Sequence, residues 1–319
     1  MNETSSLEEM FQQLMRESWA EHGVEFSSKT RLGVNVSEGI EHSIKRNAAK
    51  KLQYFDFWLA ILDEHISWFV SLFTVITSEK RENKKANDFE RATLAITSKI
   101  VSDSLALRHL STLGFDNASR PILRSLCEYL EVFVAILHQP SFADEFVKSE
   151  TPESAKTFWA EHLRGGKIRK KVTRAWEDFC GEQNSETATT FANWGRSSTP
   201  ILSGTAHPSF VGAVFSAIPL DSHNGKDDLP GTFGLKADAS VDTISIFLTF
   251  AFPVLLLSHD FPFSGFKGHI ERSFDENDEL HKHIRYGRGV LTNLIMSINQ
   301  PDTYDYLRPC FDLSIWPEK

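Results

Sequence analysis

Cysteine, glycine and proline are scarce in this sequence, and each shortage excludes a class of protein. The three cysteines, Cys127, Cys180 and Cys310, stand far apart and form no CxxC pair of the kind that indicates a zinc or redox site. Only 17 glycines and 12 prolines occur among 319 residues, which excludes collagen-like and mucin-like chains and wholesale disorder. We therefore expect a globular protein with a large core, located in a reducing compartment.

Hydrophobic runs long enough to cross a membrane are also lacking. The best candidate, residues 243–258, has 16 uncharged residues and is interrupted by Pro253, whereas a span needs about 20. We expect a buried helix there and no membrane association. The N-terminus carries acidic residues where a signal peptide needs a basic start, so we expect a cytoplasmic protein, with a formal net charge of −9.

The motifs of several enzyme classes are missing. No Gly-rich phosphate loop, nucleophile elbow or HExxH occurs, so NTPases, serine hydrolases and zincins lose their usual sequence support. Asp278, Glu279, His281 and His283 offer metal-ligating groups, but Asp278/His281 and Glu279/His283 lie on different faces of the expected helix. We expect neither a metal nor a cofactor.

Helical periodicity dominates the rest of the chain. Apolar residues recur at steps of three and four over 52–76, 88–113 and 239–259, and continue after Pro121 to 137, where Asn117 or Ser119 is a suitable N-cap. A last helix is expected after a capping box formed by Ser273 and Glu276. The predicted fold is an all-α bundle with long central helices, forming a single domain over residues 1–319.

Two regions depart from the long-helix pattern. Residues 140–200 contain shorter helical stretches separated by Gly165-Gly166 and Gly181, which predicts a peripheral insertion or lobe. Residues 210–237 contain two apolar stretches separated by a turn-rich one, typical of a small β-hairpin or an ordered loop.

A narrow polar strip follows the helix after Pro121. Arg124, Glu128 and Glu131 stand at i, i+4 and i+7, and Arg120 extends the strip by one turn. The strip is either a solvated face with an ordinary ion pair or an internal polar site. We favour the internal site, because apolar residues cover most of this helix and because Asp103 interrupts the apolar stripe of the preceding helix as well.

A second polar feature is the segment Ser203-Gly-Thr-Ala-His207-Pro208-Ser209. Pro208 disfavours helical backbone at His207, so a turn is expected to hold the imidazole beside the hydroxyls of Ser203 and Ser209. A ring that titrates near pH 7 suits proton transfer. A lone histidine also commonly caps a helix or bonds a backbone carbonyl, and both interpretations stay open.

The segment 96–137, with RPILRSLCEYLEV at its centre, followed by the His207-Pro208-Ser209 turn and another apolar helix, resembles a bacterial family of all-helical domains of unknown function. Members of that family are similar to HEPN-like helical bundles. The resemblance covers roughly residues 90–260. It implies a bundle in which Arg124 and Glu128 face His207, often encoded among stress or phage-defence genes. HEPN ribonucleases carry an Arg-x(4–6)-His motif late in the bundle, whereas the close match here, Arg16 to His22, is N-terminal.

A run of cations follows the paired glycines. Six occur within eleven residues, enough to attract a nucleic-acid backbone, although a solvated helix face is the simpler interpretation. They are Arg164, Lys167, Arg169, Lys170, Lys171 and Arg174.

The sequence leaves two hypotheses for function. The first is a cytoplasmic interaction or sensor module, homo-oligomeric, with a protein partner or RNA and an internal Arg/Glu/His site. The alternative is a metal-independent HEPN-like endoribonuclease in which His207 is the general base, Arg124 holds phosphate and Glu128 orients them.

Overall fold

The computed structural model describes residues 7–23, 55–78, 86–113, 115–181 and 237–299, and the single positions 189, 193, 196 and 202. These residues form helices, and no strand occurs among them, which confirms the all-α class. All but the last residue of the segment expected to form a hairpin (210–237) lies outside the described residues.

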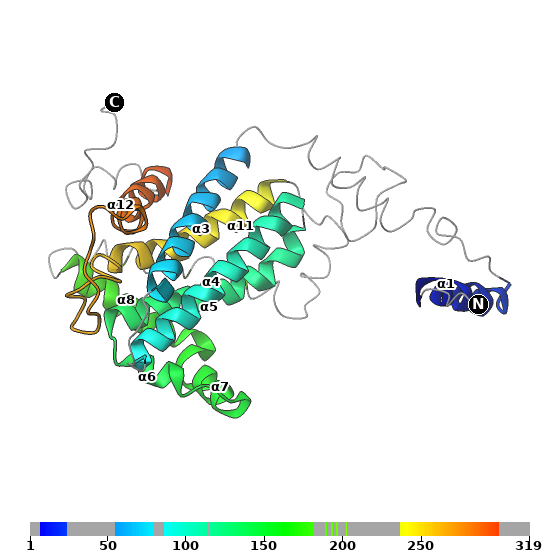
Figure 1. Cartoon of the computed structure of the whole chain (residues 1–319), viewed down its shortest axis with the longest axis horizontal. Coiled ribbons are helices and arrows are strands. Elements are labelled where there is room, and N and C mark those ends of the chain that lie inside the picture. Colours follow the sequence, from blue (N-terminus) through cyan, green and yellow to red (C-terminus); the bar gives the residue numbers. More distant parts are fainter. Residues whose placement is uncertain are drawn as a thin grey trace.

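Five long helices build the bundle (Figure 1). Helix α4 packs along α5, α5 packs along α11, and α3 packs against α4 and α12. The periodicity predicted all five, which are α3 (Phe55–Ser78), α4 (Asp88–Leu113), α5 (Asp116–His138), α11 (Ala237–Leu257) and α12 (Glu279–Asn299).

Helix α3 is central, because it buries residues from two adjoining stripes. Leu62 and Phe69 come from one stripe and Trp68 from the other, and all three are fully buried. Among the described residues, α3 alone is long and apolar enough to cross a membrane, but 61% of its most apolar window is buried in the bundle. Contacts with neighbouring helices therefore account for its composition.

Helix α11, which contains the apolar run around Pro253, also buries most of its apolar side chains in the bundle.

Short helical elements follow α5 and cover one end of it. The Gly165 and Gly166 backbones, with φ of 69° and 74°, end the 3₁₀ turn that leads into the last of these elements. Helix α6 packs on α4, and α8 packs on α5. The elements are α6 (Phe142–Val147), α7 (Pro152–Phe158), a π-helical turn η1 (Trp159–Leu163), a 3₁₀ turn η2 (Arg164–Gly166) and α8 (Ile168–Cys180). Whether residues 140–200 form a separate lobe of the single domain stays a prediction.

Helix α1 (Leu7–Ala20) lies apart from the other helices in Figure 1. It makes no part of the bundle core described above.

Two expected helix starts are wrong. Helix α12 begins at Glu279, and Asp278 caps it by accepting hydrogen bonds from the backbone N–H groups of Leu280 (2.8 Å) and His281 (3.2 Å). The expected capping box at Ser273 and Glu276 therefore lies before the helix. Helix α5 begins at Asp116, so Asn117 and Ser119 lie inside it rather than at its cap.

Candidate binding site along helix α5

The charged strip of α5 is enclosed for most of its length. Arg120 and Glu131 are buried, with 7% and 8% exposure, whereas the side chains of Arg124 and Glu128 are each about a quarter exposed. Asp103 of α4 is buried too, but it pairs with Lys99 of its own helix at 2.7 Å. The strip is thus an internal feature that opens to solvent in its middle.

Arg124 and Glu128 form an ion pair one helical turn apart. The Nε of Arg124 donates to Oε1 of Glu128 at 2.8 Å, and Nη2 lies 2.7 Å from the same oxygen. Both contacts end on Oε1, one of the two carboxylate oxygens of Glu128. The guanidinium and the carboxylate hold each other in place on the surface of α5.

Glu131 pairs with Arg169, which comes from α8. The Nε of Arg169 lies 3.4 Å from Oε1 of Glu131. Burial raises the pKa of Glu131 to about 7, and the positive charge of Arg169 opposes that rise only in part. Glu131 therefore changes its charge near neutral pH, at the contact between α5 and α8. The sequence placed Arg169 in a surface patch, so this pairing was missed.

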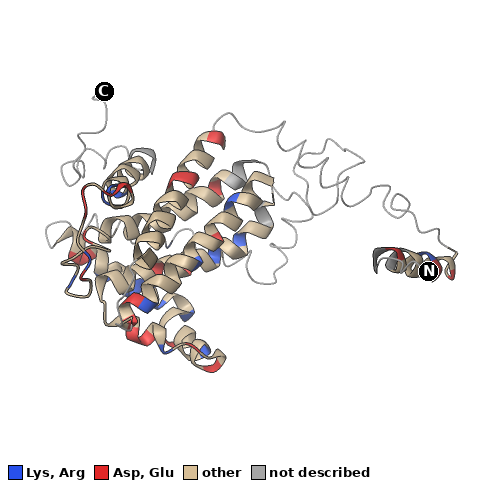
Figure 2. Ribbon diagram, viewed as in Figure 1, with Lys and Arg blue, Asp and Glu red and all other residues tan. Residues whose placement is uncertain are grey.

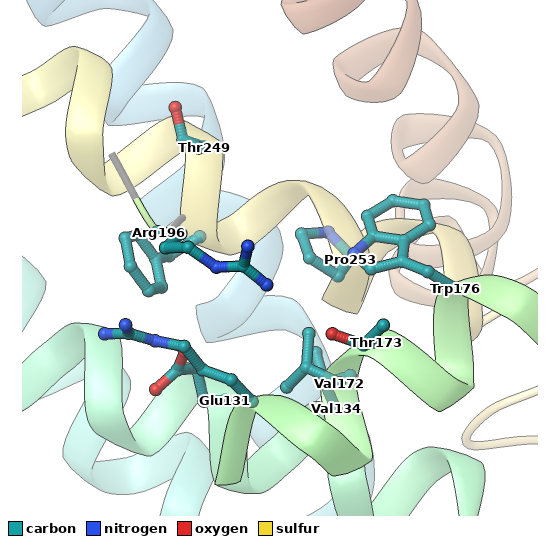
Figure 3. A pocket seen from close by; sticks show the side chains of 10 residues that line it. Glu131, Val134, Val172, Thr173, Trp176, Arg196, Thr249 and Pro253 are labelled. Atoms are coloured by element: carbon teal, nitrogen blue, oxygen red, sulfur yellow. The ribbon is translucent and has the colours of Figure 1, made fainter. Parts of the chain in front are cut away.

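Two small cavities flank the Arg/Glu pairs. One, of about 30 Å³, lies beside Glu131 and Arg169, with Arg196 reaching over it from the opposite side (Figure 3). The other, of about 20 Å³, is lined by Arg124, Glu128 and Leu202 among others. Each has room for about one water molecule beside polar groups that could bind it. Position 202 thus brings a later part of the chain to the strip.

A larger cleft of about 390 Å³ opens where the strip is exposed. Helix α5 forms its floor, and α6, α7 and the π-helical turn form its wall. Its lining joins a few polar groups to several aromatic rings: Ser125, Glu128, Tyr129, Val132, Phe146, Ser149, Ala155, Phe158, Trp159 and Leu163. Such a mixture of aromatic walls and few polar groups is typical of small-molecule sites. No sequence pattern predicted this cleft.

The histidine of the expected site lies outside the described residues. This applies to Ser203, His207 and Ser209 alike, so the meeting of Arg124, Glu128 and His207 stays a prediction.

The cation run divides into two groups. Arg164, Lys167, Lys170 and Arg174 are exposed. Lys171, in contrast, places its ammonium 4.4 Å from the centroid of the Phe142 ring, and Arg169 turns inward to Glu131. The exposed group is smaller than the sequence suggested.

No group of three or more His, Cys, Asp or Glu side chains is placed to hold a metal ion within the described residues. His283 instead shares a hydrogen bond of 2.8 Å with Ser71, and His281 Nδ1 accepts the backbone N–H of Asp275.

Fold and site together define a helical bundle with an enclosed Arg/Glu network and an adjoining cleft. Comparison of the chain with protein-family models, with curated proteins and with solved structures found no match. The family resemblance and the functions it implies therefore stay predictions.

Proposed function

We propose that the protein is a non-catalytic helical module that binds a ligand or a partner and acts as an interaction or sensor protein. The observation that carries the proposal is the internal pairing of the charged strip, Arg124 with Glu128 and Arg169 with Glu131. A guanidinium that already pairs with a carboxylate has less charge to offer the phosphate of a nucleic acid. This favours a binding role over phosphodiester cleavage.

The contact between α5 and α8 is suited to a sensor. An enclosed ion pair favours one arrangement of two helices, and a change in its charge biases that arrangement. Glu131 gains or loses its proton near neutral pH, because its pKa is about 7. A ligand in the neighbouring cleft touches Glu128, which lies one turn from Glu131 on the same helix.

The proposed setting is the bacterial cytoplasm, in stress or phage defence, because the family resemblance implies it. The proposed assembly is a homodimer that meets through a helix face. Leu94 and Leu105 of α4 are exposed, and Val101 between them is partly exposed. These three positions lie at i, i+7 and i+11, so they share one apolar stripe on the outside of α4.

The endoribonuclease alternative has one observation in its favour. Exposed cations lie close together at Arg164, Lys167, Lys170 and Arg174, and such a group attracts an RNA backbone. Leu202, which lines a cavity of the Arg/Glu network, is five positions before His207 in the sequence. In this alternative His207 takes a proton from the 2′-hydroxyl and Arg124 leaves Glu128 to bind phosphate.

An RNA cleavage assay separates the two functions. Purified protein is incubated with tRNA and with total RNA in the presence of EDTA, beside the variant His207→Ala and the matched histidine variant His138→Ala. We expect intact RNA in every reaction. Cleavage by the wild type and by His138→Ala, lost in His207→Ala, would contradict the non-catalytic module. Cleavage that persists in His207→Ala would point to a contaminating nuclease.

A further inference from the structure

We propose that the cleft between α5 and the α6–η1 segment binds a small organic cation whose charge is surrounded by alkyl groups, namely a quaternary or methylated ammonium. The inference rests on the proposed binding role and names the class of ligand. It follows from the size of the cleft, its aromatic lining, its single carboxylate and the charge around it.

The size of the cleft selects a small ligand. Its volume of about 390 Å³ lies near the lower end of the roughly 300–1,000 Å³ of small-molecule sites. A peptide helix needs a long open groove, whereas this cleft is bounded by α5 on one side and by α6, α7 and η1 on the other.

Four of the ten residues that line the cleft are aromatic. Tyr129 comes from α5, Phe146 from α6, Phe158 from α7 and Trp159 from the π-helical turn. The faces of such rings carry negative potential and attract cations, most strongly when the cation is poorly hydrated. The ammonium of Lys99 lies 5.9 Å from the centroid of the Tyr129 ring, but it pairs with Asp103 at 2.7 Å, which offsets its charge.

One carboxylate reaches the cleft. Glu128 lines it, and both contacts from Arg124 end on one of its two carboxylate oxygens, Oε1. The surroundings add negative charge, because the segment 142–163 has five carboxylates against two lysines. Figure 2 shows acidic residues on α6 and at the start of α7. None of these five carboxylates lines the cleft, so their charge acts on a ligand from outside the lining.

The wall of the cleft includes an uncommon backbone conformation, a π-helical turn. The N–H of Arg164 bonds to the carbonyl of Trp159, which closes a π-helical turn. Trp159 and Leu163, at the two ends of this turn, both line the cleft, and the indole of Trp159 is 45% exposed. Single π-helical turns are rare and are found frequently at functional sites. This turn places a large ring at the mouth of the cleft.

The same lining argues against other cations. A divalent metal ion needs about six oxygen ligands, whereas the side chains of the lining offer one carboxylate, two serine hydroxyls and the phenol of Tyr129. One of the serines, Ser149, donates to the carbonyl of Phe146. A bare ammonium ion is strongly hydrated and gains little from aromatic faces. Alkyl groups around the charge, in contrast, bury apolar surface against Val132 and the rings.

Titration calorimetry with choline tests the inference on the full-length protein. Two comparison compounds separate the contributions: 3,3-dimethyl-1-butanol, which has the shape of choline without its charge, and ammonium chloride, which has the charge without the alkyl groups. We expect saturable binding of choline and about tenfold weaker binding of both comparison compounds. Absence of saturable choline binding, or equal binding of the neutral compound, would overturn the inference.

Variants place the binding in this cleft. We expect Trp159→Ala and Glu128→Gln each to weaken choline binding about tenfold, and Trp159→Phe to stay close to the wild type. Tyr286→Ala, which removes an exposed ring of α12, serves as the control and should leave binding unchanged. Far-ultraviolet circular dichroism checks that each variant is folded. Unchanged affinity in folded Trp159→Ala would overturn the inference.

The outcome is separable from that of the RNA assay. If RNA stays intact and choline does not bind, the ligand class is wrong and the binding module stands. If RNA cleavage depends on His207, the proposed function is wrong, whether or not choline binds.

Discussion

Two buried side chains, His65 and Glu131, titrate over overlapping pH ranges with opposite effects on stability. The Nδ1–H of His65 donates to the carbonyl of Ile61 at 2.8 Å, and its Nε2 has no hydrogen-bond partner among the described residues. Burial lowers the pKa of His65 to about 4 and raises that of Glu131 to about 7. Both groups thus favour their neutral forms in the folded protein.

Replacing Glu131 by glutamine should change how stability depends on pH. The ordinary pKa of Glu131 is 4.5, so between pH 4.5 and about 7 the folded state holds a proton that the unfolded state has lost. The wild type therefore loses stability as pH rises through this window, by up to about 3 kcal/mol from this group. We expect Glu131→Gln to lack that loss, so its free energy of unfolding rises relative to the wild type as pH increases.

Urea unfolding at a series of pH values measures this difference. Glu177→Gln, which removes an exposed carboxylate of α8, is the matched control and should follow the wild type. If Glu131→Gln and the wild type differ by the same free energy at every pH, the carboxyl group is not titrating as described.

Replacing His65 by leucine should change the pH dependence of stability in the opposite direction. In the unfolded state His65 is protonated below its ordinary pKa of 6.5, whereas in the folded state it stays neutral down to about pH 4. The wild type therefore loses stability as pH falls from 6.5 to about 4. We expect the free energy of unfolding of His65→Leu, measured relative to that of the wild type, to be higher at acid pH than near pH 7 by up to about 3 kcal/mol. Thermal unfolding across this range measures it, with exposed His259→Leu as the control. Parallel curves for His65→Leu and the wild type would refute the assignment.

At the scale of the helices, the positions of helix ends are set by local hydrogen bonds. Asp278 accepts two backbone N–H groups at the start of α12. The partly buried guanidinium of Arg288 donates to the carbonyls of Leu255 and Leu256 at the end of α11. Each contact satisfies groups that a helix leaves unpaired at its ends. The second joins α11 to α12 across the bundle.

Removing the Asp278 cap should destabilise the protein by about 1 kcal/mol. We expect that loss in Asp278→Ala, and nearly wild-type stability in Asp278→Ser, because a serine hydroxyl also accepts the N–H groups of the first turn. Ser273→Ala is the control, since Ser273 lies six residues before the helix begins at Glu279. Chemical denaturation measures the stability of the three variants. An equal loss of stability in Ser273→Ala would show that Ser273 caps the helix, against the structure.

The long helices could be predicted from the sequence, because the spacing of apolar residues at three and four is a local property. The stripes of α3 and α4 were found in this way, including Asp103 at a buried position. The start of α12 was not, since both Ser273 and Asp278 are suitable capping residues and the residue type alone does not distinguish them.

The candidate site could be predicted only in part, for a related reason. Arg124, Glu128 and Glu131 share one helix, so their common face follows from their spacing. Arg169 reaches Glu131 only because Gly165 and Gly166 turn the chain and lay α8 on α5. The cleft depends in addition on a π-helical turn at Trp159, which has no periodic signature in the sequence.

At the scale of the whole molecule, the arrangement of outward-facing side chains governs association. The chain has a formal net charge of −9, which opposes contact between copies through charged faces. The stripe of Leu94, Val101 and Leu105 on α4 is apolar, so this repulsion does not act within it. Burying these side chains against a second copy would remove apolar surface from water without bringing like charges together.

We therefore expect the protein to form a dimer in solution that depends on this stripe of α4. Two charges introduced there, in Leu94→Glu/Leu105→Glu, should convert the dimer to a monomer, because a symmetric interface brings four carboxylates into one desolvated contact. Sedimentation velocity over a range of protein concentrations measures the change. The control Tyr286→Glu adds a charge at another exposed site, on α12, and should sediment as the wild type does. A wild type that stays monomeric at every concentration, or a dimer that survives both charges, would remove the α4 stripe as the interface.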